Sequence, residues 1–315
     1  MMRPRVMTRR NKPAVRRFRF IAWLTAALTA FSVAAAIPLG EVRPVATLSE
    51  GLLLPSDVAV GRDGRIYVVD SGNHRIAVFE RSGKRVQTFG ALGSGPGQLR
   101  DPVGLGLAPT GEVYVADKGN RRIQIFSADG APLRSWPVKA GGENVAPVDV
   151  ALDAGGKTVY VTGNSNHRVM AFSTDGRLQY QWGGEGVNRG EFRYPATVAV
   201  GGDGRVYVVD VLNTRVQVRD PGGAIYSVGD WGVLPGQLFR PKGVALDKRG
   251  RVYVSDSYMD VVQVFNSAYE FMHVLGSGGK PQSFTSAAGI TVDSDNRLYV
   301  AEMLKNRVSV FELPP

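Results

Sequence analysis

Three histidines are the side chains best suited to metal chemistry in this chain of 315 residues, which contains no cysteine. Three imidazoles are a ligand set that zinc accepts. His74 and His167, however, occupy equivalent places in two copies of an internal repeat, and His273 falls at a different place in another copy. We do not expect side chains at these places to converge, so the histidines predict no metal site.

Aspartate and arginine recur together and are the next candidates for chemistry. Asp70 is followed five residues later by Arg75, and the spacing recurs in Asp117 with Arg122 and in Asp210 with Arg215. A ring of acids and bases would be the functional interpretation. A group that recurs in nearly every copy is better explained as an aspartate that accepts N–H groups of a turn, with an arginine beside it. We therefore predict a structural role.

The repeat that must position these residues occurs six times. It reads GRIYVVDSGNHRIAVF from Gly64 and, in its last copy, NRLYVAEMLKNRVSVF from Asn296, with a tyrosine recurring every 46 or 47 residues. Each copy has four short runs rich in Val, Ile, Tyr and Phe, bounded by Gly, Asp and Asn, as hairpins require. Four-stranded units at this period are typical of a β-propeller. Residues 38–315 are thus predicted to form an all-β, six-bladed β-propeller of four-stranded antiparallel blades.

The sixth copy supplies only three strands before Pro315. A strand that completes this blade is available in VRPVATL, residues 42–48. Pairing this segment as the outermost strand of the last blade would remove an exposed sheet edge. The sequence therefore predicts a ring closed by an N-terminal strand.

The repeat resembles the NHL family, which is named for an Asn-His-Leu signature. Asn73-His74-Arg75 and Asn166-His167-Arg168 stand where that signature falls, and the links GSGPGQLRDP and GVLPGQLFRP also match. The resemblance covers the repeat region and implies the propeller fold. It does not choose a function, because NHL propellers include RNA-binding domains, protein-interaction domains, extracellular sensors of bacterial kinases and a zinc-dependent peptide-amidating lyase.

The lyase in that family carries its histidines directly after the proline that opens the inner strand. The equivalent residues of this chain are Ser56, Val103, Val148, Ala196, Lys242 and Ala288. None is histidine, so the resemblance implies no catalytic residue, no metal ligand and no cofactor. The channel mouth is expected to carry polar groups that include Asp57, Asp149, Thr197 and Lys242. Two carboxylates there would either hold a cation with water or simply hydrate the channel.

One asymmetry between the blades indicates a contact surface. The turn between the second and third strands has small or polar tips in blades one to three, but Val211-Leu212, Ser257-Tyr258 and Met303-Leu304 in blades four to six. Exposed apolar tips are typical of binding surfaces. The alternative is that neighbouring loops cover them. The predicted ligand-binding residues are Val211, Leu212, Trp231, Lys242, Tyr258, Met259, Met303 and Leu304.

The N-terminal segment, residues 1–37, has the charge pattern of an export signal. Eight basic and no acidic side chains lie within residues 1–20, and an uncharged apolar run follows from Phe20 to Ile37. This pattern is typical of a signal peptide, with Ala34-x-Ala36 as a cleavage site, or of an uncleaved anchor that holds the chain in a membrane. Because the basic residues precede the apolar run, the repeats are expected outside the cytoplasm, in the periplasm or secreted.

The net charge of +10 does not indicate a nucleic-acid partner, since subtracting those eight basic residues leaves about +2 for the repeats. The leading functional prediction is an extracytoplasmic binding or scaffold module that recognises a protein or peptide of the cell envelope through one face of the propeller. The alternative is a metal-dependent hydrolase or lyase acting at the channel mouth.

Overall fold

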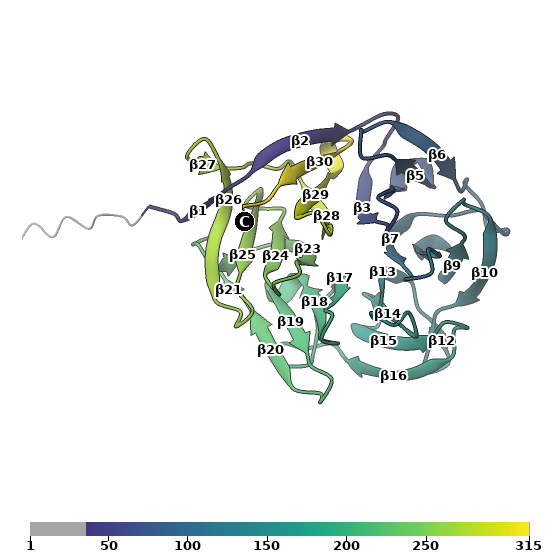
Figure 1. The fold of residues 1–315 in the computed structure, drawn as a ribbon. Coiled ribbons are helices and arrows are strands. Elements are labelled where there is room, and N and C mark those ends of the chain that lie inside the picture. The colour runs from purple at the N-terminus through teal and green to yellow at the C-terminus, as the bar shows by residue number, and fades with distance from the viewer. Residues whose placement is uncertain (1–35, 315) are drawn as a thin grey trace, which may run out of the picture. The chain divides into compact units, whose positions relative to one another are not determined.

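The computed structural model describes residues 36–314, and those from residue 37 onwards form a compact unit by themselves. The predicted signal peptide or signal anchor, residues 1–37, lies almost wholly outside the described residues. Within the described part of the chain, no helix has the length and apolar character that crossing a bilayer requires. The unit is a ring of six β-sheets around a central channel (Figure 1).

The first three blades each contain four antiparallel strands in chain order from the channel outwards. Blade one has β3 (Pro55–Val60), β4 (Ile66–Asp70), β5 (Arg75–Phe79) and β6 (Arg85–Phe89). Blade two has β7 (Pro102–Leu107), β8 (Val113–Asp117), β9 (Arg122–Phe126) and β10 (Pro132–Pro137). Blade three has β13 (Pro147–Leu152), β14 (Thr158–Gly163), β15 (Arg168–Ser173) and β16 (Leu178–Gly183).

The last three blades repeat the pattern, and two of them take in the N-terminal strands. Blade four has β17 (Pro195–Val200), β18 (Val206–Asp210), β19 (Arg215–Arg219) and β20 (Ile225–Val228). Blade five has β23 (Pro241–Leu246), β24 (Val252–Asp256), β25 (Val261–Phe265), β26 (Phe271–Ser277) and the short β27 (Lys280–Pro281), with β1 (Leu39–Glu41). Blade six has β28 (Ala287–Val292), β29 (Arg297–Glu302), β30 (Arg307–Glu312) and β2 (Arg43–Leu48).

Short elements occupy the connections between strands. Two small ladders join β11 (Lys139–Ala140) to β12 (Glu143–Asn144) and β21 (Asp230–Trp231) to β22 (Gln237–Leu238). Single 3₁₀ turns follow the second strand in four blades: η1 (Ser71–Asn73), η2 (Lys118–Asn120), η3 (Val211–Asn213) and η4 (Met303–Lys305). Because these turns recur at the same point of the blade, they lie on one face of the ring, which we call the η-turn face.

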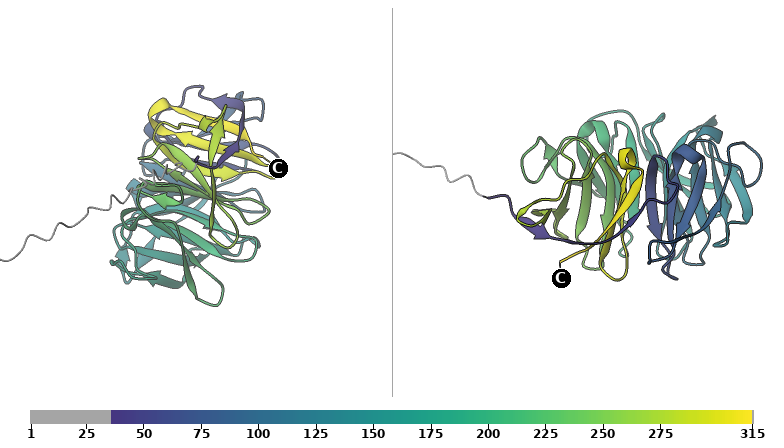
Figure 2. Two further views of the ribbon diagram at one scale, coloured as in Figure 1. Left: turned by 90° about the vertical axis from the view of Figure 1, so that its left-hand side faces the viewer. Right: turned by 90° about the horizontal axis from the view of Figure 1, so that it is seen from above.

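The predicted closure is confirmed, because β2 pairs antiparallel with β30 and completes blade six. The purple and yellow ends of the described chain run side by side there (Figures 1 and 2). A second N-terminal pairing was not predicted from the sequence: β1 adds to β26 as a parallel strand at the edge of blade five. Gly40 of β1 lies against the His273 ring, so close that a Cβ at residue 40 would overlap it. Residues 39–48 thus join two neighbouring blades.

The core consists of six hydrophobic clusters, each lying between two neighbouring blades. The cluster of blades six and one, for example, contains Leu48, Val58, Phe79 and Tyr299. Second strands such as β4 are buried along their whole length because the adjacent blades cover both of their faces, whereas the outermost strand β6 alternates between exposed and covered residues. Packing between blades therefore stabilises the ring and holds the inner strands at fixed positions around the channel.

Candidate functional site

The recurring aspartates bind turns, as predicted. The Asp70 side chain is fully buried; its Oδ1 accepts the Leu53 N–H at 2.7 Å, and its Oδ2 accepts Arg75 Nε at 2.7 Å. Asp117 and Asp210 make the same bonds with their own arginines. In blade six Glu302 takes the place of the aspartate and accepts Arg307 Nε at 2.7 Å. These groups tie the loop that enters a blade to its second turn, a structural role.

Blade five departs from this pattern in a way that shapes the η-turn face. Val261 replaces the arginine, and Asp256 instead accepts four main-chain N–H groups. Its Oδ2 binds the N–H groups of Phe239 and Arg240 at 2.7 and 3.0 Å, and its Oδ1 binds those of Tyr258 and Met259 at 3.0 and 3.1 Å. A single buried carboxylate therefore fixes both the loop before β23 and the turn after β24.

Two of the three histidines also have structural positions. His74 and His167 have φ of 54°, in the left-handed region where histidine is enriched among non-glycine residues. Their Nδ1 atoms accept the N–H groups of Asp101 and Tyr194 at 3.2 and 3.3 Å. His273 is on β26 at the outside of blade five. Among the described residues, no group of three or more His, Asp or Glu side chains is arranged to hold a metal ion.

The third residue of each inner strand forms the neck of the channel. These residues are Asp57, Gly104, Asp149, Thr197, Gly243 and Gly289. Asp57 Oδ2 accepts the Leu105 N–H at 2.9 Å, and Asp149 accepts the N–H groups of Val150 and Val198 at 2.8 Å each. The glycines make room for these carboxyls, because a Cβ at Gly289 would overlap Asp57 Oδ1 and a Cβ at Gly104 would overlap Asp149 Oδ1. The two carboxyls therefore flank the Gly104–Leu105 segment of blade two.

Both neck carboxyls are buried, and burial dominates their electrostatics. Asp57 and Asp149 are 7% and 4% exposed. Burial raises the pKa of Asp57 to about 7, although its hydrogen bonds to main-chain N–H groups act in the opposite direction. Burial also raises the pKa of Asp149 well above its usual range, and the nearby charge of Asp57 raises it further. The pair is thus coupled, and protonation of one carboxyl favours ionisation of the other.

Above the neck, on the η-turn face, the channel widens into a cavity of about 700 Å³, a size in the range of ligand pockets. Its floor contains Asp57, Asp149 and Thr197. Apolar side chains from several blades form much of its wall, including Val103, Val148, Ala196, Ala288 and Met303. Arg240 and Lys242 contribute positive charge from blade five. The cavity thus combines apolar walls with charged groups at separate places.

The structure brings four of the eight predicted binding residues to this cavity: Val211, Leu212, Lys242 and Met303. The other four do not line it. Trp231 on β21, Tyr258 and Leu304 are 71%, 58% and 66% exposed, and Met259 is half-buried in the turn held by Asp256. Tyr258 packs on Phe239 with ring centroids 4.2 Å apart. Neighbouring loops therefore bury Val211 but leave most of the large tip residues accessible.

Tyr194 and Arg240 also line the cavity, although neither was predicted from the sequence as a binding residue. Tyr194 is 51% exposed and meets the His167 ring edge-on at 5.4 Å between centroids. Both residues directly precede the proline that opens an inner strand, and that position was the available signal. The polar character predicted for blades one to three holds for their turn tips, but the loop before β3 exposes Leu53 and Leu54 on the same face.

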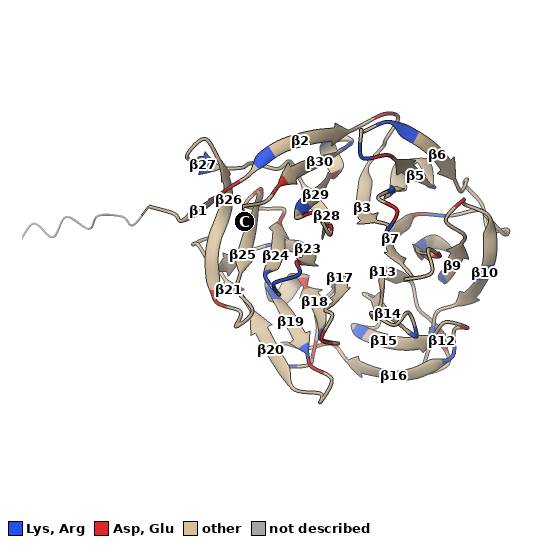
Figure 3. Ribbon diagram, viewed as in Figure 1, with Lys and Arg blue, Asp and Glu red and all other residues tan. Residues whose placement is uncertain are grey.

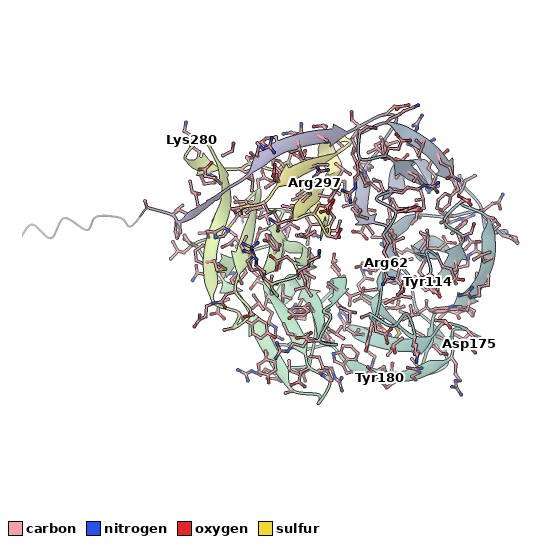
Figure 4. The ribbon with its side chains drawn as sticks, viewed as in Figure 1. Arg62, Tyr114, Asp175, Tyr180, Lys280 and Arg297 are labelled. Atoms are coloured by element: carbon pink, nitrogen blue, oxygen red, sulfur yellow. The ribbon has the colours of Figure 1, made fainter. Side chains whose placement is uncertain are left out.

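The outer strands also expose aromatic residues, but these lie away from the channel. Tyr180 on β16 lies at the rim of the ring (Figure 4), where Trp182 stacks beside it and the Arg219 guanidinium lies over both rings. Lys, Arg, Asp and Glu are scattered over all blades (Figure 3). The cavity on the η-turn face is therefore the candidate site that combines a concavity with apolar and charged groups.

Comparisons with known proteins agree with this architecture. Residues 52–79 and 99–126 match the NHL repeat family. A stretch of 51 residues, 16% of this chain, is 41% identical to the RING finger protein nhl-1 of Caenorhabditis elegans, of which it spans 5%.

The solved structures that share the fold include the three that follow. A gluconolactonase from Xanthomonas campestris has a TM-score of 0.67 at 18% identity, covering 90% of this chain and 93% of that one. A streptogramin B lyase has a TM-score of 0.61 at 14% identity and covers 87% and 97%. The WD40 repeats of RRP9 have a TM-score of 0.61 at 13% identity and cover 88% and 99%. At such identities the likeness establishes the architecture and not the activity. With two matched repeats, further copies in register and a closed ring of six blades, the chain is an NHL-repeat six-bladed β-propeller.

Proposed function

We propose that the chain is an extracytoplasmic binding module that recognises a protein or peptide through the η-turn face, over blades four to six. The observation that carries the proposal is the cavity of about 700 Å³, whose wall includes four residues expected from the sequence to bind a ligand. Exposed Trp231 and Tyr258 stand outside the cavity on the connections of blades four and five. Aromatic side chains of this kind are the usual anchors of protein interfaces.

The placement outside the cytoplasm rests on the charge pattern of residues 1–37 alone. A membrane-anchored form and a cleaved, periplasmic or secreted form would present the same binding face. A partner in the cell envelope fits either form. The near-neutral charge of the repeats and the scatter of that charge over the blades disfavour a nucleic-acid partner.

The proposal is tested by selecting peptides from a random displayed library on the immobilised full-length protein. Selected peptides are then titrated against wild type, Trp231→Ala, Tyr258→Ala and Leu212→Asp. Truncating an interface anchor costs about 2 kcal/mol or more, so each variant should bind at least about tenfold more weakly. Lys118→Ala and Ser165→Ala, on the turns of blades two and three, are the matched controls and should bind like wild type. If the controls lose affinity and the three variants do not, the binding face is elsewhere.

A second candidate function is a hydrolase or lyase that acts at the channel mouth. It is favoured by the neighbouring buried carboxyls Asp57 and Asp149 on the cavity floor, because carboxyls with raised pKa values can transfer protons near neutral pH. The structural neighbour named a gluconolactonase makes lactones the first substrates to test. Lactone hydrolysis, with and without added divalent cations, should be lost in the Asp57→Asn, Asp149→Asn double variant. Turnover that persists in this variant would show that these carboxyls are not the catalytic acid and base.

A further inference from the structure

We propose that Arg240 and Lys242 form an anion site in the cavity and bind a carboxylate of an acidic peptide segment that the partner inserts. This assignment rests on the proposed function and specifies the chemistry of its ligand. Of the residues that the structure describes, Arg240 and Lys242 are the basic ones that line the cavity. They are separated by Pro241 alone, and both line the same cavity.

Neither cation has an acidic partner in the part of the chain that the structure describes. Among residues 36–314, the side chains of Arg240 and Lys242 form no ion pair and no hydrogen bond, whereas Arg75, Arg122 and Arg215 bind fully buried carboxylates. Lys242 is half-buried, and both its burial and the positive charge of Arg240 lower its pKa. Two neighbouring positive charges repel each other in the free protein. An anion placed between them would offset that repulsion and supply the missing acceptors.

The backbone that carries the two cations is firmly held. Asp256 accepts the Arg240 N–H at 3.0 Å, and the Arg240 carbonyl oxygen accepts the Ser257 N–H at 3.0 Å. The Lys242 carbonyl oxygen accepts Thr197 Oγ1 of blade four at 2.6 Å. Residues on blades four and five therefore fix the position from which both side chains extend. Such a site loses less conformational entropy on binding than one on a mobile loop.

The repeat itself does not require these cations. In the other five blades, the residue before the start of the inner strand is Leu54, Asp101, Ala146, Tyr194 or Ser286. The second residue of the inner strand is Ser56, Val103, Val148, Ala196 or Ala288. All of these residues are neutral or acidic, so the basic pair belongs to blade five alone. In this blade Val261 stands where the arginine would be, and Asp256 accepts the Arg240 N–H in addition to that of Phe239.

The surroundings of the pair favour an acidic peptide over a nucleic acid. The side chains of Val148, Val211, Leu212 and Met303 line the same cavity, so an apolar side chain next to the bound carboxylate would be covered. A nucleic-acid strand needs a row of cations along its backbone. The cavity offers two, and the charges elsewhere are scattered over the ring (Figure 3). We therefore assign the site to a Glu or Asp side chain that has apolar neighbours.

The assignment is tested with three pools of short fluorescent peptides that have amidated C-termini. Their central residue is Glu, Gln or Lys, and their flanking positions are mixtures of Leu, Met, Phe and Ala. Fluorescence anisotropy measures the affinity of each pool for the full-length protein. We expect the Glu pool to bind about tenfold more tightly than the Gln pool, and the Lys pool to bind most weakly. The Arg240→Gln, Lys242→Gln double variant should lose this preference and retain the Gln-pool affinity. Lys118→Gln is the matched control and should keep the preference for the Glu pool.

The outcomes separate this assignment from the proposed function. If the Glu and Gln pools bind equally, and Leu212→Asp weakens both, the face binds peptides but the anion site is refuted. Binding of no pool would refute both proposals. A labelled oligouridylate that binds more tightly than the Glu pool, and depends on Arg240 and Lys242, would assign the site to nucleic acid instead. Thermal unfolding of the double variant and of Lys118→Gln checks that both remain folded.

Discussion

Replacement of Asp57 by asparagine should change how the stability of the propeller depends on pH. The pKa of Asp57 is about 7 in the folded protein, against 3.8 for an unperturbed aspartate. A carboxyl whose pKa is raised on folding contributes stability that is fully present below pH 3.8 and is lost as pH rises through about 7. Since each pKa unit corresponds to about 1.4 kcal/mol, ionisation of Asp57 should cost the wild type about 4 kcal/mol at alkaline pH.

Asparagine keeps the shape of the side chain and an oxygen that can accept the Leu105 N–H, but it cannot ionise. We therefore expect Asp57→Asn to lose less stability than wild type between pH 4 and pH 9. The substitution should also lower the pKa of Asp149, because the Asp57 charge that helps to raise it is removed. Urea unfolding at both pH values, followed by tryptophan fluorescence, gives the free energies of unfolding.

The control is Asp230→Asn, which changes an exposed carboxylate on β21 and should leave the pH dependence unaltered. If wild type and Asp57→Asn lose equal stability across this range, the carboxyl does not titrate as the burial argument requires. If both become more stable as pH rises, the sign of the argument is wrong.

Three further predictions concern export, ring closure and metal binding. A reporter fused after residue 50 should be active only outside the cytoplasm, because residues 1–37 have the charge pattern of an export signal; activity confined to the cytoplasm would contradict this. Deleting residues 1–49 should lower the melting temperature markedly, because it removes β2 and the fully buried Leu48, whereas deleting residues 1–36 should not; equal melting temperatures would argue against closure as a source of stability. The purified protein should not retain stoichiometric zinc after dialysis, and retention that requires Asp57 and Asp149 would overturn this prediction.

The repeat was sufficient to predict the architecture because every blade packs against its neighbours in the same way. Short apolar runs bounded by turn residues indicated four strands per copy, and each blade contains four such strands, with β2 as the fourth of the last blade. The three-stranded last copy indicated that residues 42–48 close the ring, as β2 does. The structural roles of Asp70 and its equivalents also followed from repetition, since a side chain that recurs in nearly every blade is expected to stabilise the blade itself.

The features that distinguish one blade from another depended on the tertiary structure. The sequence placed Asp57 and Asp149 at the channel mouth, but only the ring brings glycines of blades six and two against them and buries both carboxyls. The pairing of β1 with β26 was missed because a three-residue strand has almost no periodicity to detect. Arg240 and Tyr194 looked like ordinary loop residues, since neither fits a repeated pattern.

A site shared by several blades is therefore not visible in any single repeat. Its members come from all six blades, between Ser56 and Met303 in the chain, and their convergence is set by the arrangement of the blades around the channel. The periodic part of this sequence determined the fold, because identical local demands recur in each copy. The closed ring determined which residues line the cavity, since it places the non-repeating residues of different blades around one channel.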